Sequence, residues 1–437
     1  MSDELKIRFL GSTGEVERSG ILISKNNCRL LLDYGVKLSK PPLFPIRVAP
    51  RELNGIAVSH AHLDHTGGLP FLYVSGTMKS YLTPPTLEIT DLLIKDFLKL
   101  SGVMLPYEYV DFQSMRRRAE EVGYREEFRV NGTEFTVKLL NAGHIPGSSQ
   151  ILVDTGEERI LFTGDVNNVE TRLLKPMETD YGELDVVISE STYGGEIHPD
   201  RRETEKRFVE RVGEVVEGGG IALIPTFAVG RSQEILLILK ELGFKHRIYM
   251  DGMATTASEI ILNYPEYLRD TYSLKSAMRR VELITKWRQR KKIIREPCAL
   301  IAPAGMLGGG TVVFYLNKLY DSDKNGIFIV GFQVPGTPGK MLLEERKALI
   351  RGKVRRVKMQ TDRFHFSSHI DRKGFEKVFR RIRGEPKFFL IHGNKKNLYS
   401  LSKLIREELK YETYVPKLGE EYEIRGNRVV KRSRAPI

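Results

Sequence analysis

Two residue types that often carry chemistry are scarce in this chain. Cysteine occurs only at Cys28 and Cys298 among 437 residues, so the sequence offers neither a disulfide framework nor a thiolate zinc site. Histidine occurs only nine times. Any place where several histidines gather is therefore informative about function.

Long apolar segments are also missing. No uninterrupted apolar run approaches the roughly 18 residues that a membrane-spanning helix needs. The first residues, MSDELKIRFLG, lack the apolar core of a secretory signal peptide. We therefore expect a soluble, cytoplasmic protein that has no membrane partner.

The charges of the chain are unbalanced. It has 69 Lys and Arg against 56 Asp and Glu, which gives a formal net charge of +13. A basic surface concentrates phosphates, so the excess indicates a polyanionic partner such as nucleic acid, although it also serves solubility.

The length of the chain exceeds that of one compact core. With 41% apolar residues, the chain can fill two or more hydrophobic cores, so we expect two or more structural units.

The order of predicted elements changes near residue 200. Before it, short strands joined by glycine-containing turns occupy residues 5–35, and two hairpins occupy residues 128–165. Apolar spacings of three and four predict helices over residues 86–100 and 111–122. After residue 200, apolar strands alternate with amphipathic helices, which is typical of a doubly wound parallel sheet.

Three of the nine histidines lie in one short segment, SHAHLDHTGGLP. With the aspartate between them, the polar residues of this segment are His60, His62, Asp64 and His65. Imidazole nitrogen and carboxylate oxygen are good ligands for zinc-like ions. So short a loop can direct two ligands to one ion and two to a neighbouring ion. The segment therefore predicts a metal site.

Further candidate ligands follow predicted strands, each beside a glycine. They are His144, Asp165 and His392. Loops at strand ends are where rigid scaffolds present catalytic groups, and glycine lets backbone and metal approach closely. Taken alone, each is equally well explained as a structural residue. Together they are available as the further ligands of two ions about 3.5–4 Å apart, which a carboxylate can bridge.

The histidine segment resembles the signature of the metallo-β-lactamase superfamily, whose two-metal site uses a His-x-His-x-Asp-His motif, a distant histidine and a bridging aspartate. Asp33 in LLDYG matches the aspartate that supports the metal loop from behind. Three segments are similar to motifs of the β-CASP nucleases, with Glu190 in ISESTYGG, His369 in FSSHID and His392 in IHG. The segment PTFAVGRSQEILLIL resembles the same branch, in particular archaeal relatives of the endonuclease subunit of cleavage and polyadenylation specificity factor.

The resemblance implies an α/β fold, namely a metallo-β-lactamase αββα sandwich with an inserted β-CASP domain built on a parallel sheet. Residues 1–198 and 354–437 would form the sandwich, and residues 199–353 the insert. The resemblance also implies two zinc ions per chain. The ligands would be His60, His62 and His144 for one ion, Asp64, His65 and His392 for the other, and Asp165 as the bridge.

Catalytic roles follow from the same resemblance. His369 would protonate the leaving 3′-oxygen, and Glu190 would hold its charged form, while Asp64 and Asp165 would act in catalysis as metal ligands. The physics agrees, because imidazole titrates near neutrality and an adjacent carboxylate favours its cation. Asn394 departs from the family pattern, in which this position is often Glu.

A basic segment, residues 278–297, surrounds the single tryptophan, Trp287. Interleaved cations and an aromatic ring suit phosphate contacts and base stacking, and the alternative is a solvated helix with a buried tryptophan. The expected substrate contacts are Arg231, Arg288, Arg290, Lys291 and Ser368, whose hydroxyl can touch a phosphate.

These inferences predict a zinc-dependent ribonuclease that hydrolyses single-stranded RNA in RNA processing or decay and leaves 5′-phosphate and 3′-hydroxyl ends. Endonuclease and 5′→3′ exonuclease action both stay open. One alternative is a DNA-processing β-CASP nuclease, in which the position of His392 is typically not histidine. A small-molecule metallo-hydrolase of the thioesterase or lactonase type would need no domain-sized insert, and a scaffold subunit would have lost ligands. The resemblance also implies a homodimer formed through the C-terminal region.

Overall fold

The computed structural model describes residues 4–334, 336–426 and 428–432. The chain forms two compact units. The first comprises the residues up to Glu170, Pro176–Ile197 and those from Ser368 onward, and the second comprises Thr171–Lys175 and His198–Ser367. Among the described residues, no helix combines the length and the apolar character that crossing a bilayer requires.

The first unit contains two β-sheets. The larger sheet has the order β23-β22-β1-β2-β3-β4-β5-β6, formed by β1 (Leu5–Phe9), β2 (Ile21–Lys25), β3 (Cys28–Leu32), β4 (Gly55–Ala57), β5 (Lys79–Leu82), β6 (Ala119–Glu121), β22 (Glu421–Arg425) and β23 (Arg428–Arg432). The other sheet has the order β21-β20-β11-β10-β9-β8-β7, formed by β7 (Glu127–Arg129), β8 (Thr136–Asn141), β9 (Ser149–Asp154), β10 (Arg159–Phe162), β11 (Val186–Ser189), β20 (Lys387–Leu390) and β21 (Thr413–Tyr414).

The main core of this unit lies between the two sheets. Along β1, the alternate residues Leu5, Ile7 and Phe9 are fully buried, whereas the residues between them are partly exposed. This period of two directs one face of the strand inward. Phe9 packs there against Phe389 of β20, with ring centroids 5.4 Å apart. The sandwich is therefore held together by apolar burial.

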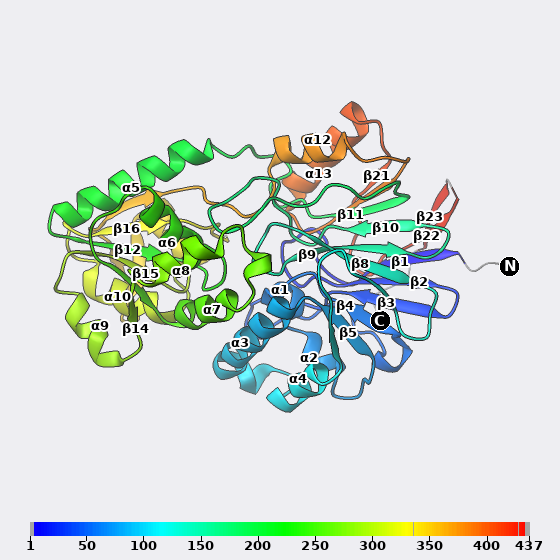
Figure 1. Ribbon diagram of the computed structural model, residues 1–437, viewed down its shortest axis with the longest axis horizontal. Helices are drawn as coiled ribbons and strands as arrows, with labels where there is room; N and C mark the ends of the chain where they lie inside the picture. Colours follow the sequence, from blue (N-terminus) through cyan, green and yellow to red (C-terminus); the bar gives the residue numbers. More distant parts are fainter. Residues whose placement is uncertain (1–3, 335, 427, 433–437) are drawn as a thin grey trace. The chain divides into compact units, whose positions relative to one another are not determined.

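Helices cover the outer faces of the two sheets (Figure 1). Those packed on the larger sheet are α1 (Leu63–Thr66), α2 (Leu69–Leu72), α3 (Pro84–Ser101) and α4 (Tyr109–Arg116), whereas α12 (Arg372–Phe379), α13 (Lys395–Lys403) and the π-helical turn η4 (Leu404–Glu408) pack on the other. The predicted αββα sandwich is thus confirmed.

One helix prediction in this unit is confirmed and another is wrong in part. The helix expected over residues 86–100 is α3, which begins with prolines after Thr83, whose hydroxyl accepts a hydrogen bond from the backbone of Thr86. The helix expected over residues 111–122 ends at Arg116 in the structure. The residues beyond it form β6, which pairs in parallel with β5. Pairing with a distant strand overrides the local helical pattern there.

The second unit is built on a parallel sheet, as predicted. Its order is β14-β13-β15-β12-β16-β19, formed by β12 (Ile221–Pro225), β13 (Ile248–Asp251), β14 (Glu282–Ile284), β15 (Cys298–Ala302), β16 (Gly326–Ile329) and β19 (Gln360–Arg363). Its helices are α5 (Arg201–Glu217), α6 (Arg231–Glu241), α7 (Met253–Leu262), α8 (Thr271–Met278), α9 (Trp287–Ile293), α10 (Gly310–Leu319) and α11 (Pro338–Glu345). A hairpin of β17 (Lys347–Ile350) and β18 (Lys353–Arg356) completes it.

Strand direction determines where the polar loops of the first unit lie. In the larger sheet, β3, β4 and β5 are parallel. In the other sheet, β10, β11 and β20 are parallel, and β8 runs in the same direction because β9 is antiparallel to both β8 and β10. The carboxyl ends within each set therefore meet at one edge of its sheet. Loops that follow these strands are brought together at that edge.

Candidate metal centre

The candidate ligands occupy the loops at these strand ends. Asp33 follows β3, His60 follows β4, Asp165 follows β10, and His392 follows β20. His144 follows β8 in the same way. All of them lie in the first unit. Residues as far apart in the sequence as Asp33 and His392 thus converge because parallel strands end together.

The histidine segment forms a tight turn that its own backbone hydrogen bonds stabilise. The carbonyl of His62 accepts hydrogen bonds from the backbone of His65 and Thr66, which starts the short helix α1. The Asp64 carbonyl accepts a bond from the backbone of Ser19 at 2.7 Å. A Cβ atom added at Gly35 would lie 1.6 Å from this carbonyl oxygen, so glycine is required there. The histidine segment is therefore held by its own backbone hydrogen bonds and by its contacts with Ser19 and Gly35.

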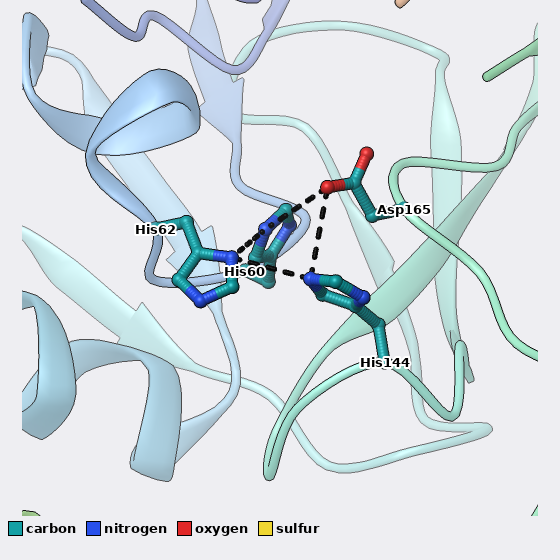
Figure 2. A group of neighbouring side chains, drawn as sticks. All are labelled: His60, His62, His144 and Asp165. Atoms are coloured by element: carbon teal, nitrogen blue, oxygen red, sulfur yellow. Dashed lines mark hydrogen bonds and ion pairs between the residues drawn. The ribbon is translucent and has the colours of Figure 1, made fainter. Parts of the chain in front are cut away.

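Four side chains form the first candidate ligand set, His60, His62, His144 and Asp165, and Figure 2 shows them pointing at one another. The Nδ1 atom of His62 lies 3.1 Å from Nε2 of His60 and 3.2 Å from Nε2 of His144. Asp165 Oδ2 lies 3.6 Å from Nε2 of His60 and 3.7 Å from that of His144. Four ligand atoms therefore surround one point.

These separations suit a single ion. Ligands at roughly 2.0–2.2 Å in a tetrahedral arrangement lie about 3.3–3.6 Å from one another. Burial lowers the pKa of His60 and His144 well below the usual range and that of His62 to about 4, so the three imidazoles are neutral and can offer lone pairs. Neutral imidazoles gathered around a carboxylate are the donor set that zinc-like ions prefer. The residues fit a metal ion.

A second candidate set lies on the other side of Asp165 and consists of Asp64, His65 and His392. Asp64 Oδ2 is 3.4 Å from Nε2 of His392 and 3.9 Å from Nε2 of His65. The Nε2 atom of His65 is buried and has no hydrogen-bond partner among the described residues. It faces Asp165 Oδ2 at 3.5 Å. A buried polar atom without a partner is costly, so this geometry also fits a cation.

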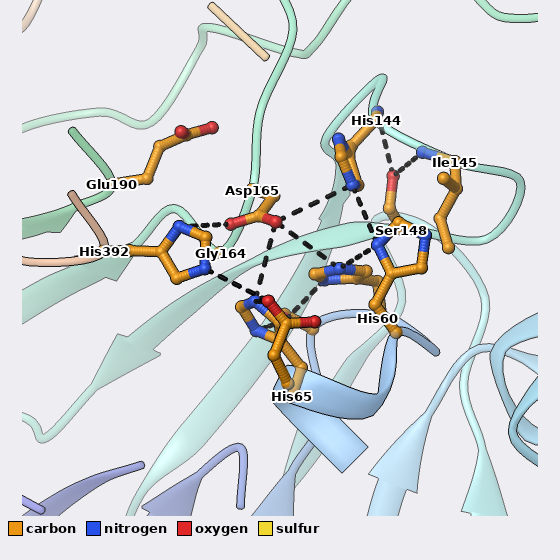
Figure 3. A network of polar contacts seen from close by, with 12 residues as sticks. His60, His65, His144, Ile145, Ser148, Gly164, Asp165, Glu190 and His392 are labelled. Carbon is orange, nitrogen blue, oxygen red and sulfur yellow. Dashed lines mark hydrogen bonds and ion pairs between the residues drawn. The ribbon is translucent and has the colours of Figure 1, made fainter. Parts of the chain in front are cut away.

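Asp165 joins the two sets (Figure 3). Its Oδ2 atom faces the first set and His65, while its Oδ1 atom lies 3.3 Å from Nδ1 of His392. Burial alone would raise the pKa of Asp165, but the imidazoles of His392, His65 and His369 hold it well below its usual range. The carboxylate is therefore ionised and placed to bridge two cations.

Asp33 contacts Ser59 and His65 of the histidine segment from behind. One of its oxygens accepts a hydrogen bond from the backbone of Ser59 at 2.7 Å, and the other accepts one from the Ser59 hydroxyl at 2.7 Å. The second oxygen also accepts a bond from Nδ1 of His65 at 2.7 Å. This contact fixes the ring so that Nε2 faces the cluster. Asp33 and His392 both have left-handed backbone (φ 57° and 51°), an uncommon conformation that clusters at functional sites.

His369 and Glu190 form a charged pair beside the cluster. Nδ1 of His369 lies 3.0 Å from Glu190 Oε2, and its Nε2 lies 4.0 Å from Asp165 Oδ2. Burial opposes a charge on the ring, but the carboxylates of Glu190 and Asp165 outweigh it and raise the pKa of His369 to about 9. Glu190 also accepts a hydrogen bond from the backbone of Val166 at 2.7 Å. The ring is therefore a cation that points toward the cluster at neutral pH.

Ser368 contacts the cluster through its backbone. Its carbonyl oxygen accepts a hydrogen bond from Nδ1 of His144 at 2.9 Å. This bond orients the ring of His144 with Nε2 toward His62 and Asp165. The sequence suggested only a role for the hydroxyl of Ser368 on a phosphate, and the backbone contact was not foreseen.

A loop between β1 and β2 also contributes to the site, although we did not predict it from the sequence. The carbonyl oxygens of Ser12 and Glu15 accept hydrogen bonds from the backbone of His392 and Gly393, at 2.8 and 3.0 Å. The side chain of Glu15 is held by Arg18 and by Lys37, the latter at 2.8 Å. This loop therefore positions His392, and through Ser19 also Asp64. The segment GSTGEVERSG, with three glycines directly after a strand, was the available signal.

The remaining predicted substrate contacts lie in the second unit. Arg231 is the first residue of α6 and is buried. Arg288 and Lys291 are exposed on α9. Arg290 is different, because its Nε and Nη2 atoms donate to both oxygens of the buried Asp251, at 2.7 and 2.9 Å. We therefore revise the expectation that Arg290 binds substrate phosphates, since its guanidinium is already occupied.

Comparison with protein-family models gives three matches along the chain. The Beta-Casp domain matches residues 232–342, and the Zn-dependent metallo-hydrolase RNA specificity domain matches residues 354–416. The model of the anti-Pycsar protein Apyc1 matches residues 5–203. Together the three models account for most of both units.

Full-length relatives are similar over almost the whole chain. An RNase named aCSPSF2 from Saccharolobus solfataricus is 39% identical over 420 residues, which cover 95% of this chain and 84% of the relative. A probable RNase, MJ4, from Methanocaldococcus jannaschii is 33% identical and covers 96% and 100%. Transcription termination factor FttA of the same organism is 33% identical and covers 94% and 70%.

One solved structure shows the same fold at low sequence identity. It is the crystal structure of a protein of unknown function from Enterococcus faecalis V583, with a TM-score of 0.62 and 13% identity. The match covers 96% of this chain and 100% of that one.

The role of Asp33 can be tested by substitution. Asp33→Ala removes the acceptor that orients His65, so we expect affinity for an ion in the second set to fall about 10- to 100-fold while the first set keeps its ion. Metal content after equilibration in a buffer of defined free zinc measures this. Asp91→Ala is the matched control, because Asp91 is also buried and ion-paired, with Lys95 and Arg116, but lies in a different cluster. Equal metal content in Asp33→Ala and the unaltered protein would contradict the assignment.

Proposed function

The chain belongs to the β-CASP family of metal-dependent ribonucleases with the metallo-β-lactamase fold, and from this premise we propose that it hydrolyses single-stranded RNA with two zinc ions. The observation that carries the proposal is the convergence of two ligand sets on Asp165, with the His369–Glu190 pair beside them. The relatives named as RNases support the choice of RNA.

The metal-binding roles follow the two ligand sets. One zinc would be held by His60, His62 and His144, the other by Asp64, His65 and His392, and Asp165 would bridge them. When bound, such ions polarise the phosphoryl oxygens and lower the pKa of a bound water. The protein supplies a largely buried donor set, since five of the seven ligands are buried and His62 and Asp64 are partly exposed.

His369 would supply the proton that the reaction needs. Cleavage of the bond between phosphorus and the 3′-oxygen leaves a developing negative charge on that oxygen. The imidazolium of His369 would donate its Nε2 proton there and produce a 3′-hydroxyl, while water adds to phosphorus to give the 5′-phosphate. Glu190, buried and 3.0 Å from Nδ1, stabilises the imidazolium and fixes the ring.

Other substrate classes are less well supported. A thioesterase or lactonase would use the metal ligands but would have no need of the second unit, of the His369–Glu190 pair or of a net charge of +13. A DNA-processing nuclease shares the chemistry, but the relatives named as RNases cover more than nine tenths of this chain. A scaffold subunit without activity does not explain why every ligand position is filled.

We also propose domain boundaries, a cellular location and an oligomeric state for the protein. Residues 199–353 would be the β-CASP insert, which the Beta-Casp match over residues 232–342 supports, and residues 1–198 and 354–437 would form the metallo-β-lactamase part. The second compact unit extends to Ser367, because β19 pairs with β16. We place the enzyme in RNA processing or decay in the cytoplasm, and we propose a homodimer through its C-terminal region.

Substrate class can be tested directly. The zinc-loaded protein is incubated with single-stranded RNA, single-stranded DNA of the same sequence and a chromogenic thioester, each with and without a chelator. We expect hydrolysis of RNA alone, abolished by the chelator and restored by added zinc. Products should carry 5′-phosphate and 3′-hydroxyl ends. Chelator-resistant cleavage, or thioester hydrolysis that exceeds RNA cleavage, would refute the proposal.

Substitution of His369 separates proton delivery from metal binding. Because His369 is not a proposed ligand, His369→Ala should keep both zinc ions and RNA affinity while the rate of cleavage falls about 10²- to 10⁴-fold. Elemental analysis and single-turnover cleavage measure the two effects on the same preparation. His246→Ala serves as control, since His246 is exposed, forms an ion pair with Glu217 and contacts the ring of Phe244, all in the second unit. A His369→Ala protein that lacks metal would show that the roles are wrongly assigned.

Glu190 should set the pH range of the reaction. Its negative charge raises the pKa of His369, so the imidazolium persists to higher pH. Glu190→Gln keeps an acceptor for Val166 but removes the charge, and the alkaline limb of the cleavage rate should move to lower pH. Glu217→Gln, which alters the exposed pair with His246, should leave the profile unchanged. The role of Glu190 fails if its variant and the unaltered protein share one alkaline limb.

A further inference from the structure

Helix α9 in the second unit presents the single tryptophan of the chain to solvent. Trp287 is 53% exposed. Within residues 278–297, it is the one large apolar side chain that the structure leaves exposed. Sequence reasoning left open whether this ring is buried, and the structure excludes burial. An exposed indole forgoes a large apolar contribution to stability, so its position calls for another explanation.

Contacts with Phe314 and Arg290 hold the ring of Trp287 in place. The centroid of its ring lies 4.7 Å from that of Phe314 on α10. The guanidinium carbon of Arg290 lies over the Trp287 ring, 5.2 Å from the ring centroid. Arg290 is in turn bound to the buried Asp251, which also accepts a hydrogen bond from the Tyr315 hydroxyl at 2.6 Å. An aromatic surface supported in this way loses little entropy when a second ring stacks on it.

The other cations around Trp287 differ from Arg290, because no carboxylate of the described residues neutralises them. They are Lys286, Arg288, Lys291 and Lys292, all exposed. Among the described residues, none of these four has a carboxylate within ion-pair distance, whereas Arg290 is neutralised by Asp251. The surface therefore carries a local excess of positive charge around one fixed aromatic ring. Such a surface attracts a polyanion that also has aromatic groups.

We propose that this surface, formed by Trp287 and the four cations and named here the α9 shelf, binds single-stranded RNA. A nucleobase stacks on Trp287, and the adjoining phosphates contact Arg288 and Lys291. The inference rests on the proposed function, since it adds a binding site for the same substrate. In this proposal Arg290 is a positioning residue, because it holds the indole of Trp287 in place. The phosphates are contacted by Arg288 and Lys291 instead.

The observations favour RNA over an anionic membrane surface. A helix that lies in a membrane interface needs an apolar face of several side chains, and α9 exposes one ring among charged residues. A ring between cations instead matches a strand in which bases alternate with phosphates. Both alternatives are distinguished in the experiment below.

The single tryptophan makes the α9 shelf directly observable. The full-length His369→Ala protein, in which we expect cleavage to be slow, is used for the measurement. Its indole fluorescence, excited selectively, reports on Trp287 alone. Addition of an unstructured single-stranded RNA should quench this fluorescence, and rising salt should reverse the effect. Inorganic polyphosphate, which has the charge but no bases, should compete for the site with little quenching. These results support stacking on Trp287.

Variants test the contribution of the ring to affinity. In Trp287→Leu we expect RNA affinity to fall about tenfold, and in Trp287→Phe to recover most of that loss. Tyr272→Leu is the matched control, because Tyr272 is 76% exposed on α8 and should leave affinity unchanged. Arg288→Ser with Lys291→Ser should reduce the slope of log affinity against log salt by about 1.4, since each phosphate contact contributes about 0.7. Arg202→Ser with Lys206→Ser, an exposed pair on α5, should not.

Failure of the inference is distinguishable from failure of the proposed function. RNA cleavage by the unaltered protein, together with unchanged fluorescence and normal affinity of Trp287→Leu, would overturn the shelf and leave the nuclease intact. Absence of both RNA binding and cleavage would overturn the proposed function and the shelf with it. A blue shift of the fluorescence on anionic phosphatidylserine vesicles but not on RNA would assign the surface to membranes and overturn the inference.

Discussion

The carboxylate of Asp165 is the buried charge on which the first unit depends. It lies between four imidazoles that reach it from three other loops, at distances from 3.3 to 3.7 Å. An ionised carboxylate is costly to bury unless opposite charges and hydrogen bonds compensate. Here the neighbouring imidazoles stabilise the ionised form, and metal ions would do so more strongly. The loops at this edge of the sandwich thus supply the groups that stabilise the buried Asp165 carboxylate.

The apolar sandwich supplies rigidity, and the strand ends supply the chemistry. Buried alternate residues fix the register of the strands, so each strand ends at a defined position. The same register then determines where each imidazole lies. Supporting contacts refine the result, as when Asp33 orients His65 and the carbonyl of Ser368 orients His144. His369 differs from the three neutral imidazoles of the first set, His60, His62 and His144, because Glu190 keeps it charged.

Much of the candidate site could be predicted from the sequence, because its signals are local. The His60–His65 segment is contiguous, and glycines beside His144, Asp165 and His392 mark loops after strands. Other features depend on contacts between distant residues that carry no local signal. Asp251 neutralises Arg290 across 39 positions, and β6 replaces part of a predicted helix because β5 offers it a partner. The exposure of Trp287 likewise follows from packing that the basic segment alone could not reveal.

Metal occupancy around Asp165 is the direct test of the two-metal centre. Crystals of protein purified without chelator can be measured by anomalous diffraction on either side of the zinc absorption edge. We expect two anomalous peaks per chain, about 3.5–4 Å apart, one beside His62 and one beside His392, with Asp165 between them. No peak at this position, or a single peak that leaves His65 and His392 without a ligand role, would contradict it.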